Sequence, residues 1–334
     1  MRQSVALAAV TGWPVHVINA RSRRAKPGLQ PQHVRVVEAI CELVNGRAEG
    51  VCLGSLEFTF RPGRIAAGAG PYLWDIGSAG STTLLALAVL PVMVFAPGPM
   101  EAELQGGIFQ DFAPSFFHLQ QVMFPLLGRM GLEAAIEMIR PGYVPRGGGV
   151  LRLTTLPVEG CIHPLVHEEA EAVESLWGIS VASHLERRAV ARRMADASRE
   201  LLRAEGYEAN VDTRDDTDAV QSGAALALFA DFAGGGRLGA DWAGAFGRPA
   251  ETIGKTVAGQ LIGDLKSGAT LDRHAAAQII PFAALAEGES RFRIPGASEH
   301  IQSNAWLVQE FLGARVEVHG QLMSVRGVGF RRRL

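Results

Sequence analysis

Three copies of one local pattern limit the fold of this chain more than any other feature of its sequence. Each copy consists of an amphipathic helix, a glycine and two short strands. The helices are expected at 32–44, 116–130 and 301–312, and the strand pairs at 51–53 and 56–60, 134–139 and 150–153, and 316–318 and 322–325. Apolar residues recur every three or four positions in the helices and partly alternate in the strands. Repeated units of this kind predict an internally repeated α/β architecture.

The interval between the second and third copies is too long for the same period, which predicts an insertion. Its expected elements are strand 178–182, helix 185–205, strand 207–211, polar loop 212–218, strand 224–229 and glycine-rich turn 234–236. A helix over 251–265 is expected to return the chain to the main body. The predicted fold class is α/β (α+β), with a large repeated domain of residues 1–173 and 250–334 and a small inserted α/β domain of residues 174–249.

Charge and cysteine content exclude several classes of protein. The 334 residues carry a formal net charge of −2, so no overall field draws the chain to nucleic acid or to a membrane. Three scattered cysteines do not make a disulfide framework, which predicts a reducing, cytoplasmic setting. The apolar run 84–96 is too short to span a bilayer and predicts a buried helix followed by a strand. Residues 5–10 already resemble the middle of a helix, so no signal peptide is expected.

A basic segment, Arg21 to His33, is the first candidate for a binding site. Four basic side chains and a Pro27-Gly28 turn precede a helix, which gathers cations and free backbone N–H groups of the kind a phosphate needs. A solvated basic loop explains the same residues equally well. Arginine accounts for 29 of the 32 basic residues, and codon bias is a simpler reason for that excess than phosphate recognition.

Two further segments lie where helices are expected to begin. Small residues over 75–83 permit a close backbone approach before the apolar helix, although capping alone explains many such sequences. Ser298 is expected to cap the helix that follows, which places His300 in its first turn. The helix dipole disfavours the imidazolium there, and a neutral imidazole could act as a nucleophile or base. A lone histidine more often has a structural role.

A metal site is not predicted. Cys161, His163, His167 and Glu168 could be drawn as ligands, but Pro164 interrupts the helix that the His163 to His167 spacing requires. The sequence also contains no P-loop, no dinucleotide-binding fingerprint and no Gly-x-Ser-x-Gly elbow. Common phosphate-binding and serine-hydrolase motifs are therefore excluded.

Taken in order, these segments resemble the RNA 3′-terminal phosphate cyclase family, from Arg2 to about Gly329. The most specific matches are Arg24-Ala25-Lys26-Pro27-Gly28-Leu29 with Gln32-His33, Phe60-Arg61-Pro62-Gly63, Ile76-Gly77-Ser78-Ala79-Gly80-Ser81, Tyr143-Val144-Pro145-Arg146-Gly147-Gly148-Gly149 and His300-Ile301-Gln302-Ser303-Asn304. The resemblance implies a large domain of three repeated units with a small insert, as the repeats themselves predict.

The resemblance also implies a reaction in three steps. A histidine attacks the α-phosphorus of ATP, AMP moves to an RNA 3′-phosphate, and the neighbouring 2′-hydroxyl displaces AMP to close a 2′,3′-cyclic phosphate. His300 matches the nucleophile. The phosphate side of the pocket would be lined by Arg2, Arg21, Arg24 and Gln32, and the nucleotide side by His274, Ala275, Ala276, Ala277 and Gln278. ATP with Mg²⁺ or Mn²⁺ and an RNA bearing a 3′-phosphate are the implied ligands, with neither DNA nor a membrane as a partner.

The sequence departs from the family pattern at several positions. Ala277 stands where an aspartate is expected, Leu87 where a glutamine contacts ATP, and Gly106-Gly107-Ile108-Phe109 replaces Gly-Gly-Thr-Asp. Members also carry a strand and a Gly-Glu-Gly-Gly-Gln segment, with an acidic residue near the metal, ahead of the position of Arg2. A late start, a truncation or a real loss would each explain that difference. Since each change removes a polar contact, a second hypothesis is an RNA-end-binding or ribosome-assembly factor that is catalytically weakened or inactive.

Overall fold

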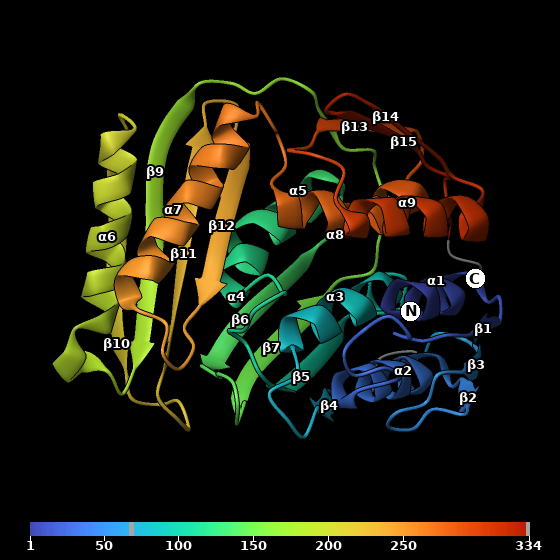
Figure 1. The fold of residues 1–334 in the computed structure, drawn as a ribbon. Helices are drawn as coiled ribbons and strands as arrows, with labels where there is room; N and C mark the ends of the chain where they lie inside the picture. The colour runs from blue at the N-terminus through green and yellow to red at the C-terminus, as the bar shows by residue number, and fades with distance from the viewer. Residues whose placement is uncertain (67–69, 332–334) are drawn as a thin grey trace.

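The computed structural model describes residues 1–66 and 70–331, and it confirms a mixed α/β fold with repeated units. Three sheets surround a shared set of helices, and a fourth sheet with its own two helices lies to one side (Figure 1). Among the described residues, each helix is either too short or too polar to span a bilayer. The three four-stranded sheets share one pairing pattern, in which one parallel pair is followed by two antiparallel pairs.

The first sheet has the order β1-β3-β2 and is antiparallel throughout. Its strands are β1 (Val15–Val17), β3 (Phe58–Arg61) and β2 (Arg47–Glu49), and its helices are α1 (Arg2–Thr11) and α2 (Pro31–Val44). The prediction of strands at 51–53 and 56–60 is wrong in its boundaries. Asn45 ends α2 in the left-handed conformation, with φ 48°, and the chain enters β2 two residues later.

The second sheet has the order β4-β5-β7-β6. Its strands are β4 (Tyr72–Asp75), β5 (Met100–Gly106), β7 (Gly149–Thr155) and β6 (Ala134–Arg140). The predicted buried helix is α3 (Thr82–Met93), and β5 begins only after the Pro97-Gly98-Pro99 turn. The predicted helix 116–130 consists of α4 (Phe116–His118), a π-helical turn η1 (Leu119–Met123) and α5 (Phe124–Arg129).

The third sheet has the order β14-β15-β13-β8 and lies beside the last two helices. Its strands are β14 (Arg315–His319), β15 (Leu322–Arg326), β13 (Glu289–Arg293) and β8 (Val166–His167). The helices are α8 (Arg273–Leu285) and α9 (Glu299–Leu312), which pack against each other. This region matches the third predicted unit closely.

The fourth sheet, β10-β9-β11-β12, belongs to the predicted insertion. Its strands are β9 (Val173–Ser183), β10 (Ala209–Asp216), β11 (Gly223–Phe232) and β12 (Arg237–Ala243), and its helices are α6 (Val190–Ala204) and α7 (Ala250–Lys266), with a 3₁₀ turn at Glu186–Arg188. Most of the predicted polar loop 212–218 is instead strand, paired in parallel with β9.

Helix α7 was expected in the main body, but its apolar side chains are buried in the core of the fourth sheet. Ile253, Val257 and Leu261 are buried there with residues of α6 and β11. Because this apolar face is buried against the fourth sheet, α7 packs with the insertion. The predicted domain boundary at residue 249 instead assigns α7 to the large domain. The division into two domains is otherwise still a prediction.

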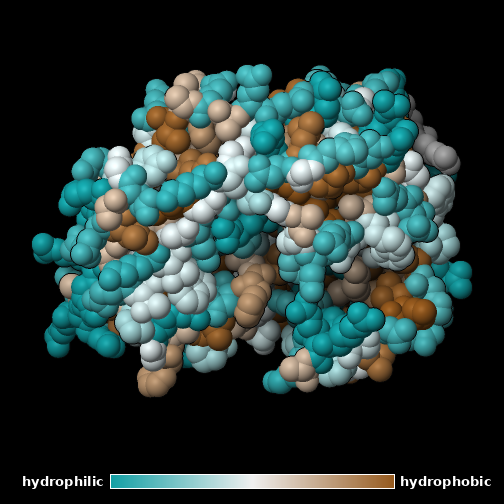
Figure 2. Space-filling model, turned by 45° about the horizontal axis from the view of Figure 1, so that its top comes forward, coloured by the Kyte–Doolittle hydropathy of each residue, from teal (hydrophilic) through white to brown (hydrophobic). Residues whose placement is uncertain are grey.

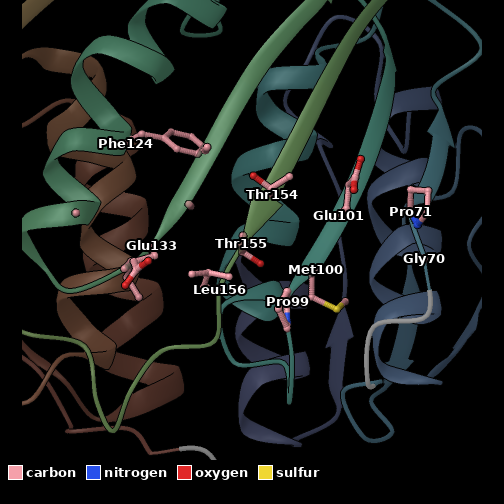
Figure 3. Close-up of a pocket in the computed structure, with 14 residues that line it drawn as sticks. Gly70, Pro71, Pro99, Met100, Glu101, Phe124, Glu133, Thr154, Thr155 and Leu156 are labelled. Carbon is pink, nitrogen blue, oxygen red and sulfur yellow. The ribbon is translucent and has the colours of Figure 1, made fainter.

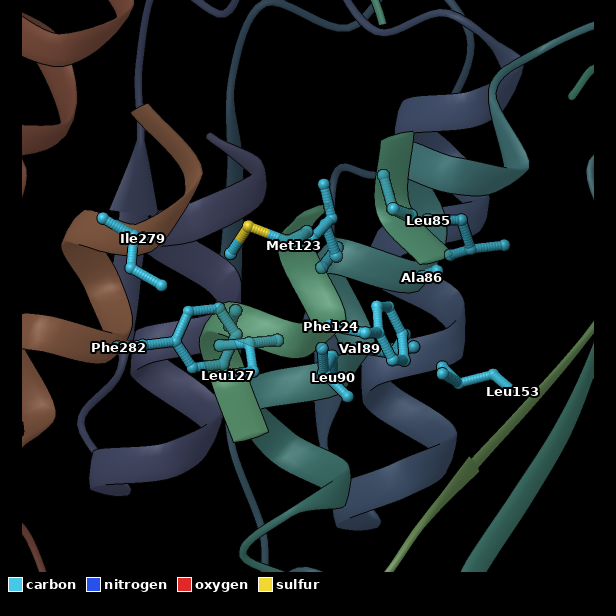
Figure 4. Close-up of a cluster of buried hydrophobic side chains, with 14 of the residues drawn as sticks. Leu85, Ala86, Val89, Leu90, Met123, Phe124, Leu127, Leu153, Ile279 and Phe282 are labelled. Atoms are coloured by element: carbon cyan, nitrogen blue, oxygen red, sulfur yellow. The ribbon is translucent and has the colours of Figure 1, made fainter. Parts of the chain in front are cut away.

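The main core joins the helices to buried residues of the first three sheets and also includes buried residues of β9 and β11 in the fourth sheet. Figure 4 shows Val89 of α3 beside Phe124 of α5, and Phe282 of α8 beside Leu127 of α5. These side chains come from segments far apart in the sequence, so their packing holds the repeated units together.

Candidate active site

His300 lies in the first turn of α9 and is exposed to a cavity of about 550 Å³. Ser298 caps the helix as predicted, because its Oγ accepts a hydrogen bond from the N–H of Ile301 at 3.3 Å. The cavity is lined by Met1, Arg2, Gln3, Ser4, His300, Gln302, Ser303, Asn304, Trp306 and Leu307. The imidazole is thus held at a helix start where a ligand can reach it.

Arg2 lines the same cavity from α1, although 298 positions separate it from His300 in the sequence. Its Nη1 donates to the carbonyl of Leu84 at 3.1 Å, and its Nη2 donates to Oε1 of Gln278 at 3.0 Å. Burial lowers the pKa of Arg2 to about 10, so the guanidinium is still charged at neutral pH. The structure therefore places a fixed cation beside the candidate nucleophile.

The guanidinium of Arg21 stabilises the loop to which it belongs. Its Nη1 donates to the carbonyls of Lys26 and Gly28, at 2.7 and 2.8 Å. Gly28 has φ 74°, and a Cβ there would lie 2.2 Å from the carbonyl oxygen of Gly54, so only glycine fits. Arg24 is exposed on the same turn, and its backbone N–H donates to the carbonyl of Arg21. One predicted arginine thus shapes the loop while the other faces solvent.

The side chain of His33 lies close enough to Arg21 of this loop and to Arg2 of α1 for both cations to lower its pKa. Burial lowers the pKa of His33 to about 4, and repulsion by Arg21 and by Arg2 adds to the shift. Its neutral Nδ1 accepts a hydrogen bond from the N–H of Gln30 at 3.1 Å. Because both arginines act on one imidazole, the basic loop and the start of α1 form one electropositive region.

Gln32 joins this region to the glycine-rich segments that precede α3. Its Oε1 accepts a hydrogen bond from the N–H of Ser81 at 2.8 Å. That segment touches the backbone after β5, since a Cβ on Gly107 would lie 2.3 Å from the carbonyl oxygen of Ala79. Gln32 therefore supports the loop that begins α3.

The predicted nucleotide-side residues divide into two groups. The side chains of Ala275, Ala276 and Ala277 are buried in the main core, as is Leu87, and none of them lines the cavity. Gln278 instead reaches Arg2, and the carbonyl of Ala277 accepts a hydrogen bond from Nδ2 of Asn304 at 2.7 Å. This stretch positions Arg2 and α9 through Gln278 and one backbone carbonyl.

His274 belongs to a buried polar cluster that the sequence did not indicate. Asp272 accepts hydrogen bonds from Nε2 of His118 at 3.0 Å, from the N–H groups of His274 and Ala275, and from that of Gly239. The ring centroids of His118 and His274 are 5.4 Å apart. His118 and Gly239 are distant in the sequence, so no local pattern could have revealed the cluster.

The protonation states of Asp272, His118 and His274 follow from their burial and from the contacts among them. Burial raises the pKa of Asp272, but His118 and the N–H donors outweigh that effect and hold the pKa well below its usual range. Burial lowers the pKa of His118, yet attraction by Asp272 produces a net increase. Burial lowers the pKa of His274, which keeps that ring neutral. The ion pair of His118 and Asp272 joins α4 to the start of α8, the N–H of Gly239 adds β12, and none of these residues lines the cavity of His300.

A second cavity, of about 660 Å³, lies at the end of the second sheet. Figure 3 shows Thr154, Thr155 and Leu156 between Phe124 and Glu133 on one side and Met100 and Glu101 on the other. No Lys, Arg or His is among the described residues that line it, which makes it a poor site for a phosphate. The cavity of His300 is the better candidate for nucleotide chemistry.

The surface and the metal-binding side chains add little to this picture. Figure 2 shows one face of the molecule, where hydrophobic residues form separate patches among mostly hydrophilic ones. Within residues 1–66 and 70–331, no group of three or more His, Cys, Asp or Glu side chains could hold a metal ion. The described residues that the sequence analysis considered as metal ligands form no such group. One of them, Cys161, donates a hydrogen bond from its Sγ to Oε2 of Glu287 at 2.8 Å.

Comparison with known proteins is consistent with this geometry. A family model described as RNA 3′-terminal phosphate cyclase matches residues 1–318. Proteins named RNA 3′-terminal phosphate cyclase from Methanopyrus kandleri and Methanothermobacter thermautotrophicus are each 37% identical to this chain, over 326 and 321 residues. These matches cover 96% of this chain in both cases, and 92% and 93% of the relatives. A relative of the same name from Hyperthermus butylicus is 38% identical over 95% of this chain and 89% of its own length. The chain belongs to the RNA 3′-terminal phosphate cyclase family, as the sequence motifs predict.

Proposed function

We propose that this protein is an ATP-dependent RNA 3′-terminal phosphate cyclase, which converts a 3′-phosphate end into a 2′,3′-cyclic phosphate. The observation that carries the proposal is the cavity in which His300 and Arg2 lie together. An exposed imidazole beside a fixed guanidinium provides a nucleophile and a counter-charge for a phosphate. The family name of the relatives supports the same reaction.

His300 would attack the α-phosphorus of ATP, forming an N–P bond as pyrophosphate leaves. Arg2 offsets the negative charge that develops on the phosphate oxygens, because it is fixed by Leu84 and Gln278 before the ligand arrives. The positive region around Arg21 and Arg2 attracts the polyanionic substrate. Exposure of His300 allows the imidazole to reach the nucleotide without a rearrangement of α9.

The RNA end would then accept AMP on its 3′-phosphate, which frees His300. A phosphate monoester is a poor electrophile because its own charge repels the 2′-oxygen, and adenylation converts the 3′-phosphate into a group with a good leaving group. Attack by the 2′-oxygen closes the ring and releases AMP. We propose that the exposed guanidinium of Arg24 contacts RNA phosphates outside the cavity, since its charge faces solvent beside the same loop.

The size and charge of the cavity support ATP as the ligand, whereas the side chains around it support a metal only in part. A cavity of about 550 Å³ is within the range of small-molecule and cofactor pockets, which is roughly 300–1,000 Å³. The described residues include no cluster of metal-binding side chains, so we propose that Mg²⁺ or Mn²⁺ would be held mainly by phosphate oxygens and water. The metal would supply charge neutralisation. We also propose that the reaction takes place in the cytoplasm.

The test is the transfer of label from ATP radiolabelled at the α-phosphate. Acid-labile label is expected on the wild type with Mg²⁺ or Mn²⁺ and should be absent from His300→Ala. His319→Ala is a matched control, because His319 is also exposed but lies on β14, outside the cavity lining. Binding of 3′-phosphorylated RNA without any label on the wild type would instead favour the second hypothesis, an RNA-end-binding or ribosome-assembly factor.

A further inference from the structure

Phe112 and Phe246 have the most exposed large hydrophobic side chains among the described residues, with relative exposures of 97% and 109%. Phe112 lies in the loop between β5 and α4, and Phe246 lies in the loop between β12 and α7. Because burial of a phenyl ring is strongly favourable, two fully exposed rings indicate a surface that contacts another molecule. The backbone of Phe112 is also in the left-handed region, with φ 66°, which is costly for a bulky residue.

An ion pair holds these two loops together. Asp111, the residue before Phe112, accepts hydrogen bonds from Nη1 and Nη2 of Arg248, each at 2.9 Å. The guanidinium of Arg248 also lies over the ring of Trp242, with its Cζ 3.7 Å from the ring centroid. A bidentate pair that is packed on an aromatic face has a defined geometry. The two exposed phenyl rings are therefore carried on one fixed support.

A glycine-rich turn over residues 145–148 brings cations to the same end of the molecule. Nη1 of Arg146 donates to the carbonyl of Val220 at 3.2 Å, and Nε of Arg140 donates to that of Gly148 at 2.7 Å. Within residues 1–66 and 70–331, neither arginine forms an ion pair, and Arg146 is exposed. In Figure 1, this turn and the loops after β5, β10 and β12 lie along the lower edge of the molecule.

Two carboxylates of these loops already have partners. Asp111 is paired with Arg248, and Asp216 accepts hydrogen bonds from Oγ of Ser183 at 2.6 Å and from the N–H of Asp218 at 3.2 Å. Asp218 itself is exposed, so the local charge is mixed. Exposed rings with accompanying cations are typical of sites that bind single-stranded nucleic acid by stacking.

The same turn is continuous with the backbone that supports the cavity of His300. A Cβ on Gly147 would lie 2.8 Å from the carbonyl oxygen of Ser78, so the turn touches the glycine-rich segment that precedes α3. In the first turn of α3, the carbonyl of Leu84 accepts the hydrogen bond from Arg2. A strand whose 3′ end lies at Arg2 therefore has a short path along this segment to the exposed rings.

We propose that Phe112, Arg146 and Phe246 form a loop junction that binds the single-stranded RNA leading into the 3′-phosphate end. Bases stack on the two phenyl rings, and the guanidinium of Arg146 contacts a phosphate of the same strand. Because every base has a face that can stack, this surface provides affinity without selecting a sequence. This inference rests on the proposed function, which places the 3′ end in the cavity of His300.

Strand length tests the proposal, because a short ligand that fills the cavity cannot reach the loop junction. Affinities for a 3′-phosphorylated dinucleotide and for a 3′-phosphorylated decauridylate are measured by calorimetry without ATP. The wild type is expected to bind the decauridylate roughly 5- to 100-fold more tightly, the range for one base-stacking contact. A double variant, Phe112→Ala with Phe246→Ala, should lose that gain and bind the dinucleotide as the wild type does. Tyrosine at both positions keeps an aromatic face and should retain the gain.

Matched controls separate the loop junction from a general effect of surface substitution. Leu156→Ala removes a side chain that is 45% exposed at the opposite end of β7. Arg146→Gln should weaken binding of the decauridylate and lower its dependence on salt, because one phosphate contact is lost. Arg47→Gln is its control, since Arg47 is also exposed but lies on β2 of the first sheet. Leu156→Ala and Arg47→Gln should leave both affinities unchanged.

The outcomes separate this inference from the proposed function. Equal binding of the two ligands by the wild type, or a gain with length that survives in the double variant, would overturn the loop junction. A double variant that changes only the sedimentation of the protein would also overturn it, because the rings would then make a protein contact. Label on His300 in the wild type would leave the cyclase proposal standing in these cases. Loss of the gain in the double variant, with no label on the wild type, would support the loop junction and contradict the cyclase proposal. Thermal unfolding checks that each variant is folded.

Discussion

Helices α8 and α9 begin with the same arrangement, a capping side chain followed two residues later by a histidine. Asp272 caps α8 ahead of His274, and Ser298 caps α9 ahead of His300. At α8 the cap is a buried carboxylate and the histidine is packed against His118. At α9 the cap is an exposed hydroxyl and the histidine faces a cavity. Position in a helix therefore does not decide what a histidine does; the surroundings of the helix start do.

The largest expected contrast is between the two histidines themselves. His300→Ala should reduce adenylate formation about a thousandfold or more, because no other side chain replaces a missing nucleophile. His274→Ala should leave the folded protein able to take label, since the ring lies in the buried cluster. Labelling rates of both variants, corrected for the folded fraction, check this. Loss of label in both would mean that the α8 histidine also serves the reaction.

The two capping residues should differ strongly in their effect on stability. Asp272→Asn is expected to lower the free energy of unfolding by about 3–5 kcal/mol, because it removes the charge that pairs with the buried His118. Urea unfolding measures the effect, with Asp218→Asn, an exposed aspartate, as the control. A change below about 1 kcal/mol would show that the Asp272 cap contributes no more to the free energy of unfolding than the Ser298 cap does.

A third helix start, that of α2, extends the comparison to pH. The pKa of His33 falls from 6.5 to about 4 on folding, so the unfolded chain binds a proton more readily between these values. Stability should therefore decrease as pH falls from 6.5 to 4 and then level off. We expect about 1–2 kcal/mol of this loss from His33 once solvent screening of the half-buried ring is included.

His33→Gln isolates that contribution. Glutamine at this position can still accept from the backbone N–H of Gln30, as in a capping box. Urea unfolding at pH 7 and at pH 4.5 should show a smaller difference for this variant than for the wild type. Equal differences would mean that His33 is not buried enough to resist protonation.

The smallest expected effect is at the α9 cap. Ser298→Ala should cost about 1 kcal/mol in the free energy of unfolding, because it removes the side-chain acceptor for the N–H group of Ile301. Ser298→Asp should restore the stability, since a carboxylate also accepts from that N–H and suits the helix dipole. Thermal unfolding of both variants tests the order. A loss for Ser298→Ala as large as that for Asp272→Asn would remove the contrast between the two helices.

The sequence predicted the repeated units well because helix and strand periodicities are local. It failed where distant pairing decides the structure. Residues Asp212 to Asp216 look like a loop because they are polar, but β10 is an edge strand, where charged side chains are exposed and common. The apolar face of α7 is visible in the sequence, whereas the sheet that covers it is not.

The candidate site shows the same division. Ser298 and His300 could be placed together because a capping residue and the first turn of a helix are neighbours in the sequence. Arg2 was associated with them only through the family resemblance. Phe112 and Phe246 had no signal, since each looks ordinary until its exposure is seen. The pairing of His118 with Asp272 spans 154 positions, so only the folded chain shows it.

The scarcity of lysine has a practical consequence for the loop that Arg21 holds. Only Lys26, Lys255 and Lys266 carry side-chain amines, and Lys266 is already paired with Glu205. Lys26 is exposed on a turn whose shape Arg21 fixes through the carbonyl of Lys26. Amine-reactive dyes and crosslinkers will therefore modify very few positions, one of them next to the electropositive region, and can place a spectroscopic reporter there without any engineered cysteine.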